Sequence, residues 1–332
     1  MKKRKFFSFA AIGLAGSLLL SACSGDSTSG DNAGEGEKVY KVGITQFVTH
    51  PSLDSATEGF KKALKEEGLT VEYDEQNANG DQTTVQTIAA NLAGDNVDLI
   101  FANATPSALA ALNATKDIPI VFTSVTDPVK VQLVQSMEEP GGNVTGTADM
   151  HPEAIPNTVK FIHENFPDAT IGTVYSAGEP NSVVQVEVMR EAAEELGMKK
   201  PVESTVATSA EVKQAAESLV GKADVIFIVT DNTVVSALES VVQVAEEKDI
   251  PLFVGELDSV NRGGFAAYGF SYEDIGYEAG TMAAQILKGE KEPSELPAQY
   301  PQNLKLVMNK KAAEEMNIEL KDEWNDIAEF IE

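Results

Sequence analysis

The sequence predicts an α/β protein made of two similar open parallel-sheet lobes, joined by a hinge and separated by a cleft. Two observations predict this class. Short apolar runs alternate with helical patterns along the chain, which is typical of a parallel sheet covered by helices. The same order of runs and helices then recurs at an offset of roughly 126–132 residues. With 332 residues, the chain is long enough for two domains that each bury a core.

Charge and cysteine content exclude several classes of function. The formal net charge is −27, from 25 Lys and Arg residues against 52 Asp and Glu residues. Nucleic acid requires a basic surface, so the acidity argues against nucleic-acid binding. It also argues against electrostatic docking on an anionic membrane surface. A single cysteine allows neither an internal disulfide nor a thiolate metal cluster.

The first 22 residues have the pattern of a secretory signal peptide. The basic cluster Lys2–Lys5 precedes the apolar run Phe6–Leu20, which is too short and too rich in Gly and Ser to span a membrane comfortably. The run closes on Leu20-Ser21-Ala22-Cys23, which resembles the bacterial lipobox, in which the cysteine is lipidated. Residues 23–37 are rich in Gly, Ser, Asp and Glu and indicate a flexible tether. The sequence therefore predicts an extracytoplasmic protein anchored to the cell membrane through Cys23.

The elements of the first half follow in regular order after Lys38. Tyr40–Thr45 is predicted as a strand and Asp54–Glu67 as a helix, which Gly68 ends as a C-cap. A strand over Leu69–Tyr73 and a helix over Asp81–Leu92 follow, and then two buried strands, Val97–Ala102 and Ile118–Phe122.

The second half repeats this plan. Its predicted elements are the strand Ile171–Tyr175, the helices Ser182–Glu195 and Lys213–Val220, and the strands Ala223–Thr230 and Ile250–Val254. The segment Asp258–Phe270 lacks strong periodicity and contains Gly263-Gly264, so we interpret it as a crossover to the first lobe. A helix over Asp274–Leu287 then belongs to that lobe, and a last strand, Leu304–Val307, and helix, Lys310–Asn317, end the chain. The expected lobes are residues 38–148 with about 266–290, and residues 149–265 with about 291–332.

Open parallel sheets bind ligands at the carboxyl ends of their strands, and two such lobes form a cleft between them. The candidate site residues are therefore those that follow the predicted strands. In the first lobe they are Gln46, Phe47, His50, Asn103, Ala104, Thr105, Thr123, Thr126 and Asp127, and in the second Glu179, Asn181, Ser182, Asp231, Asn232 and Glu256.

Some of these residues have a structural alternative. Asp231 ends a buried strand, and its carboxylate suits a ligand ammonium, while Asn232 suits the N-cap of a helix over Thr233–Glu247. Asp127 precedes a proline, so it either faces the ligand or initiates a turn. His50 either contacts ligand or has a structural role.

The sequence lacks the motifs of common enzyme classes. It contains no phosphate-binding P-loop, no dinucleotide-binding glycine motif, no nucleophile elbow and no zinc-protease HExxH. Its three histidines are far apart in sequence, so a histidine-rich metal site is not expected. The sequence therefore predicts a protein that is not an enzyme and that uses neither a cofactor nor a metal.

Several segments in this order and spacing resemble one family. They are residues 42–64 (VGITQFVTHPSLDSATEGFKKAL), 118–129 (IPIVFTSVTDPV), 140–146 (PGGNVTG), 179–182 (EPNS) and 230–232 (TDN). Together they resemble the ABC-transporter substrate-binding lipoproteins of the tryptophan/tyrosine-uptake type, which have a type I periplasmic-binding-protein fold. The resemblance implies capture of a small solute such as an aromatic or other amino acid. It also implies hinge closure and delivery to a permease driven by an ATPase subunit.

For such a ligand, the resemblance suggests residue roles. Thr105, Ser107 and Thr126 would hold the α-carboxylate together with helix N-termini, and Asp231 would hold the α-ammonium. Phe47 and Tyr175 either flank an apolar ligand side chain or belong to the core. After the signal peptide the only arginines are Arg190 and Arg262, and neither ends a predicted strand, so a zwitterion or cation fits better than a dianion. The alternative function is a lipid-anchored sensor that presents its solute to a membrane receptor.

Overall fold

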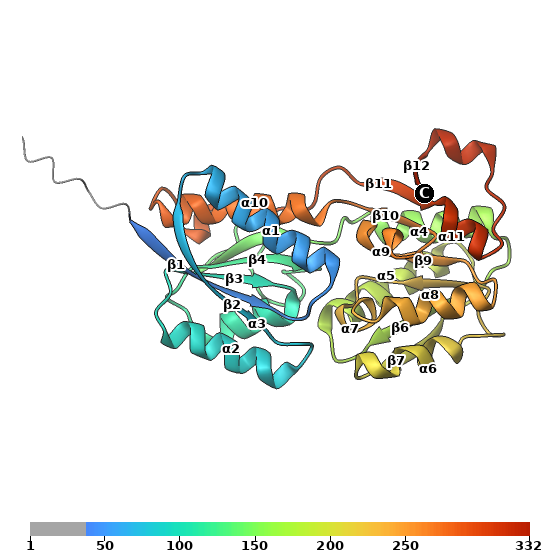
Figure 1. Ribbon diagram of the computed structural model, residues 1–332, viewed down its shortest axis with the longest axis horizontal. Coiled ribbons are helices and arrows are strands. Elements are labelled where there is room, and N and C mark those ends of the chain that lie inside the picture. Colours follow the sequence, from blue (N-terminus) through green and yellow to red (C-terminus); the bar gives the residue numbers. More distant parts are fainter. Residues whose placement is uncertain (1–37) are drawn as a thin grey trace, which may run out of the picture. The chain divides into compact units, whose positions relative to one another are not determined.

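The computed structural model describes residues 38–332, which form two β-sheets with helices on both faces of each (Figure 1). The predicted signal peptide, tether and lipidation site at Cys23 lie outside these residues. No helix within the described range is both long and apolar enough to cross a membrane. The predicted α/β class with parallel-sheet lobes is confirmed.

The first sheet has five strands, all parallel, in the order β2-β1-β3-β4-β5. The strands are β1 (Val39–Gln46), β2 (Thr70–Asn77), β3 (Leu99–Asn103), β4 (Ile120–Val125) and β5 (Val144–Ala148). Helices α1 (Pro51–Glu66) and α10 (Tyr272–Leu287) cover one face, and α2 (Gln82–Gly94) and α3 (Thr105–Ala114) cover the other (Figure 1). Strands β3, β4 and β5 are buried along their whole length, as expected for a sheet covered on both faces.

The second sheet has seven strands in the order β12-β11-β10-β9-β8-β6-β7. They are β6 (Ile171–Ser176), β7 (Val202–Val206), β8 (Val225–Ile228), β9 (Leu252–Val254), β10 (Ala266–Gly269), β11 (Lys305–Asn309) and β12 (Ala328–Ile331). Only the β10–β11 pair is antiparallel. The helices are α4 (Ala154–Asn165), α5 (Pro180–Glu195), α6 (Val212–Glu217), α7 (Asn232–Val235), α8 (Leu238–Glu247), α9 (Leu257–Asn261) and α11 (Lys310–Glu315). Short 3-10 turns lie at Ser209–Glu211, Pro293–Glu295 and Asp322–Asp326.

The duplication read from the sequence appears in the strand order. The series β2-β1-β3-β4-β5 of the first sheet matches β7-β6-β8-β9-β10 of the second. The carboxyl ends of β1, β3 and β4 therefore have counterparts at the ends of β6, β8 and β9. Each lobe thus contributes equivalent strand-end loops.

The chain passes between the sheets three times, and two of the expected boundaries need correction. Strand β10 pairs with β9 and β11, so the return to the first sheet follows Gly269, later than the expected 266. After α10 the chain stays with the first sheet, because Leu296 accepts a hydrogen bond from Thr145 and Gln299 from the Ala148 amide. The final crossing therefore comes after Gln299, later than the expected 291.

Two segments differ locally from the prediction. The segment 258–270 holds α9 and β10, and is therefore not a bare crossover. At Gly264 the backbone of this segment packs closely against Val254 of β9, because a Cβ there would lie 2.6 Å from the Val254 side chain. The single helix expected over Thr233–Glu247 is two helices, α7 and α8, separated at Ser236 and Ala237.

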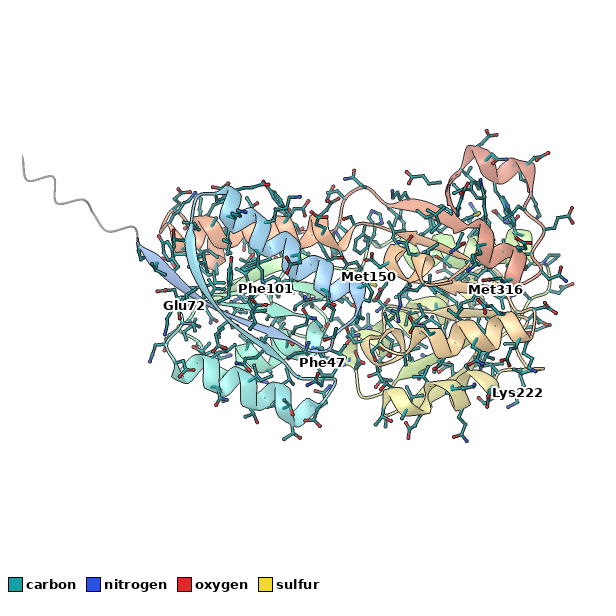
Figure 2. The ribbon with its side chains drawn as sticks, in the orientation of Figure 1. Phe47, Glu72, Phe101, Met150, Lys222 and Met316 are labelled. Carbon is teal, nitrogen blue, oxygen red and sulfur yellow. The ribbon has the colours of Figure 1, made fainter. Side chains whose placement is uncertain are left out.

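The first lobe buries two hydrophobic clusters, and the second lobe buries one. In the first lobe Phe101 lies on β3 (Figure 2). Its ring stacks on that of Phe60 of α1, with ring centroids 3.8 Å apart. In the second lobe the only tryptophan, Trp324, is 2% exposed and donates to Asn165 Oδ1 at 3.0 Å.

Candidate ligand-binding site

The strand-end loops of the two lobes meet at the N-terminus of α1. Ser52 Oγ in its first turn donates a hydrogen bond to Glu256 Oε2 after β9. His50, the residue before the helix, places Nε2 3.4 Å from Asn232 Oδ1 after β8. All four side chains are less than one-tenth exposed. The predicted strand-end residues His50, Asn232 and Glu256 are therefore brought together from opposite lobes.

A second meeting point lies beside α5. Gln185 Nε2 donates to Thr126 Oγ1 at 3.2 Å, and the Thr126 hydroxyl donates to Asp149 Oδ1 at 3.1 Å. On the surface nearby, Lys130 Nζ forms an ion pair with Glu187 Oε2 at 2.6 Å. The Thr126 hydroxyl is thus already engaged by two protein groups, which argues against its expected role as a carboxylate donor.

The N-terminus of α3 has the features of an anion site. Ala104, at the end of β3, has φ +86°, which a non-glycine residue rarely adopts and which turns the chain abruptly into the helix. Thr105 and Ser107 follow, and these residues are 1% and 0% exposed. Their hydroxyls are buried and have no hydrogen-bond partner within residues 38–332. The first N–H groups of a helix have no partner within the helix, and its dipole favours an anion there. These groups together can bind a carboxylate.

Asn103, the last residue of β3, is held by its amide nitrogen. Nδ2 donates to the Leu53 carbonyl at 2.7 Å and to Thr57 Oγ1 at 3.0 Å. Its Oδ1 is buried and has no partner in the described part of the chain. Asn103 therefore offers a fixed acceptor at the same strand end.

Glu179, before α5, is a buried carboxylate surrounded by neutral donors. Oε1 accepts from the Thr233 amide at 2.9 Å and from Thr233 Oγ1 at 2.7 Å. Oε2 accepts from Asn232 Nδ2 at 2.6 Å and from Asn181 Nδ2 at 3.2 Å. Glu179 therefore ties the N-terminus of α7 to that of α5.

Asp231 has a different role from the expected one. It is the N-cap of α7, with Oδ1 accepting from the Val234 amide at 2.7 Å, and its Oδ2 accepts from the Ser176 amide at 2.6 Å. The sequence analysis expected Asp231 to face the ligand and Asn232 to cap the helix. The second expectation is wrong, because Asp231 is the N-cap. Both carboxylate oxygens of Asp231 are already bonded to the backbone. Burial and the negative charge of Glu179 raise the pKa of Asp231.

Burial also shifts the ionisation of the residues that join the lobes. It raises the pKa of Glu256 to about 7, against the opposing effect of the hydrogen bond from Ser52. It lowers the pKa of His50 to about 4, so the imidazole is neutral at neutral pH. The contacts between the lobes at the N-terminus of α1 therefore involve a neutral imidazole and a carboxyl group that titrates near neutrality.

Asp149 is a polar residue of this region that the sequence analysis missed. It lies directly after β5, is 7% exposed, and accepts from Thr126 Oγ1 and from Tyr272 Oη at 2.8 Å. Burial raises its pKa to about 6. Strand β5 (VTGTA) has no long apolar run, and only a strand assignment there would have placed Asp149 at a strand end.

The other predicted site residues have contacts within their own lobes. In the first lobe, Gln46 Nε2 donates to Asp54 Oδ1, Thr123 Oγ1 lies 2.9 Å from Thr147 Oγ1, and Asp127 Oδ1 accepts from the Lys130 amide. Phe47 belongs to a buried hydrophobic cluster of this lobe and is 1% exposed. In the second lobe, Tyr175 Oη donates to Glu203, and Ser182 Oγ accepts from Asn181 Nδ2. For Asp127 the turn alternative fits this contact. For Phe47 the core alternative fits its burial. Within the described residues, no group of three or more His, Cys, Asp or Glu side chains is placed to hold a metal ion.

Comparison with known proteins identifies the family. Residues 41–329 match the family described as ABC transporter substrate binding protein. The chain belongs to this family. Its members are substrate-binding proteins, not enzymes, in agreement with the sequence analysis. The chain is 42% identical over 318 residues to a tyrosine-binding protein of Clostridioides difficile, covering 93% of this chain and 91% of that protein.

Two solved relatives differ in how well they superpose. An ABC domain from Streptococcus pneumoniae in complex with L-Trp is 33% identical, with a TM-score of 0.83, covering 89% of this chain and 100% of that one. A ligand-free, open substrate-binding protein from Clostridium difficile is 40% identical, but its TM-score is 0.65, covering 88% of this chain and 99% of that one. The structure therefore resembles the ligand-bound relative more than the open one, despite the lower sequence identity.

Proposed function

We propose that this chain is the solute receptor of an ABC importer for an aromatic amino acid, which it binds between its two lobes. The N-terminus of α3 carries this proposal. There, two buried hydroxyls without partners in the described chain, Thr105 and Ser107, stand beside free helix N–H groups. An α-carboxylate supplies acceptors for all of these donors.

The relatives support the nature of the ligand. One is a tyrosine-binding protein and another was solved with L-Trp. The buried strand-end region holds the carboxyl groups of Asp149, Glu179 and Glu256, so a ligand that carries a positive charge as well as a carboxylate complements it. A zwitterionic amino acid satisfies both requirements.

Delivery and anchoring belong to the same proposal. The family is that of ABC-transporter substrate-binding proteins. The permease and ATPase subunits of such a transporter are the expected partners. The signal-like segment and Cys23 support an extracytoplasmic protein held at the cell membrane by a lipid. A receptor in this place passes its solute to the permease and opens again.

Isothermal titration calorimetry of the purified chain with tyrosine, tryptophan, phenylalanine and leucine tests the proposal. We expect an aromatic amino acid to bind and, at about 100 Kd, to add roughly 2.7 kcal/mol to the free energy of unfolding. Ser107→Ala should weaken that binding by about tenfold or more, because a hydrogen bond to a charged group is lost. Ser294→Ala, at an exposed serine in a 3-10 turn, is the matched control. Absence of binding to tyrosine, tryptophan and phenylalanine would contradict the proposal, with or without binding of leucine.

A further inference from the structure

The surroundings of Glu179 fix the orientation of two asparagine side chains. A carboxylate only accepts hydrogen bonds, so the amide nitrogens of Asn181 and Asn232 must both face it, at 3.2 and 2.6 Å. Asn181 Nδ2 also lies 3.3 Å from the Thr230 carbonyl, which again only accepts. The Oδ1 atom of each asparagine therefore points away from Glu179.

This orientation decides the tautomer of His50. Asn232 Oδ1 lies 3.4 Å from His50 Nε2, and an amide oxygen accepts but does not donate. Nε2 therefore carries the proton, since a bare Nε2 would set two lone pairs against each other. The neutral ring then leaves Nδ1 as an acceptor. A pKa of about 4 agrees with a neutral ring.

One hydrogen-bonded chain thus ends in an unused acceptor on each lobe. It runs from His50 through Asn232 and Glu179 to Asn181. His50 Nδ1 and Asn181 Oδ1 are both buried and have no hydrogen-bond partner among the residues described. The two side chains are 4% and 2% exposed, so bulk water does not readily satisfy these acceptors. A bound molecule that presents hydrogen-bond donors would satisfy them.

The charge of this region selects the kind of donor. Every hydrogen-bond partner of Glu179 is a neutral N–H or O–H group. Arg262 lies close enough to lower the pKa of His50, but its guanidinium donates to both carboxylate oxygens of Glu239 at 2.8 Å and to the Val235 carbonyl. The buried charge of Glu179 therefore has no cation bonded to it in the described structure. A cationic donor would compensate this charge, whereas a phenol or an indole N–H would not.

We propose that His50 Nδ1 and Asn181 Oδ1 receive the protonated amino group of the ligand, and that Glu179 is the positioning residue that orients both acceptors. This inference rests on the proposed function and assigns to these residues the role that the sequence analysis gave to Asp231. Closure of the lobes completes the amino-group site, because His50 comes from one lobe and Asn181 from the other.

Nitrogen NMR of the histidine rings tests the positioning part. In uniformly ¹⁵N-labelled protein we expect His50 to show a protonated Nε2 and an unprotonated Nδ1 at pH 7, with His151→Gln and His163→Gln variants to assign the other two rings. Glu179→Gln frees the Asn232 amide to rotate and should change the His50 tautomer populations. A protonated Nδ1 in the wild type would overturn the proposal, as would an unchanged His50 signal in a folded Glu179→Gln protein.

Calorimetry with two ligands tests the amino-group assignment. His50→Gln can keep a nitrogen near Asn232 but removes the Nδ1 acceptor, so tyrosine binding should weaken by about tenfold to a hundredfold. Binding of 3-(4-hydroxyphenyl)propanoate, which lacks the amino group, should be weak in the wild type and change little in the variant. His163→Gln, the same substitution at an exposed position on α4, is the control.

The outcomes separate this inference from the function on which it rests. If wild-type protein binds none of tyrosine, tryptophan and phenylalanine, the proposed function fails. If wild-type protein binds tyrosine and His50→Gln binds it equally well, only the amino-group assignment fails. An equal loss for tyrosine and for its analogue without the amino group would also overturn the assignment, because the missing contact would then serve another part of the ligand.

Discussion

The buried carboxyl group of Glu256 makes the stability of the folded protein depend on pH. It is 2% exposed, and its hydrogen-bond donors are the hydroxyls of Ser52 and Ser259. Two hydroxyls do not fully replace the water that an ionised carboxylate loses on burial, and the pKa of Glu256 rises from 4.5 to about 7. The folded protein therefore holds a proton at Glu256 between about pH 4.5 and 7 that the unfolded chain has released.

The sign of the pH dependence follows from this proton. The stability that the raised pKa contributes is fully present below about pH 4.5 and is lost as the pH rises through 7. Glu256→Gln removes the ionisation. The free energy of unfolding of the variant relative to the wild type should therefore be about 2 kcal/mol higher at pH 8 than at pH 5, since one pKa unit is about 1.4 kcal/mol. Urea denaturation of ligand-free protein at both pH values measures this, with Glu290→Gln, at an exposed glutamate, as control. A difference that does not vary with pH would contradict the raised pKa.

At the level of single residues, the sequence predicted positions better than roles. His50, Asn181, Asn232 and Glu256 were placed at strand ends, where the structure finds them buried, because strand ends can be read from apolar runs. Capping depends on one local backbone geometry, so the choice of Asn232 over Asp231 as the cap was wrong. The same uncertainty applies to any polar pair at a strand-to-helix turn.

The α1–α10 pair shows why elements distant in sequence pack so closely. Gly59 on α1 and Gly276 and Gly280 on α10 lie where the two backbones touch, and a Cβ at Gly276 would overlap the Ala56 carbonyl. These glycines cost helix propensity, but they allow contact between the two helices without intervening side chains. The contact holds α10, which follows the second crossing of the chain, against the first sheet.

Gly276→Ala should therefore destabilise the protein although alanine is the better helix former. We expect a loss of about 1–3 kcal/mol, because overpacking exceeds the propensity gain of about 1 kcal/mol. Gly94→Ala, at the end of α2 with open space around its Cα, is the matched control and should be neutral or stabilising. Thermal and urea denaturation measure both variants. Equal behaviour of the two would show that α1 and α10 can separate without cost.

The predictability of elements followed the length of their apolar pattern. Long amphipathic helices such as α1 and α10 were predicted to within a few residues. Strand β10 (AAYG) and helix α9 are four and five residues long, too short for a periodic signal, and the adjacent Gly263-Gly264 favoured a loop. Tertiary contacts with β9 and β11 decide their structure, and no local pattern reports such contacts.

At the scale of the whole molecule, the duplication was the most reliable signal in the sequence. Five elements in one order predicted two lobes, and the shared strand order confirms them. The crossing points were less accurate, because the two copies exchange chain segments after the repeat ends. How far the lobes close depends on a few polar contacts, and a pattern of apolar runs contains no information about them.

Glu256 allows closure to be tested with a matched pair of variants. Its carboxylate accepts from Ser52 in the other lobe and from Ser259 in its own. Ser52→Ala should shift ligand-free protein toward an open state and weaken ligand binding by the factor by which the closed population falls. Ser259→Ala removes a hydrogen bond to the same carboxylate, but this bond lies within the second lobe and does not join the two lobes. It should therefore leave closure unchanged.

Small-angle X-ray scattering gives the radius of gyration of each variant with and without tyrosine. We expect ligand to reduce it in every case, and we expect ligand-free Ser52→Ala to be more expanded than ligand-free wild type or Ser259→Ala. If both serine variants weakened tyrosine binding equally without a change in the ligand-free radius, Glu256 would act through its own lobe alone. Closure would then depend on the remaining contacts, between His50 and Asn232, between Gln185 and Thr126, and between Lys130 and Glu187.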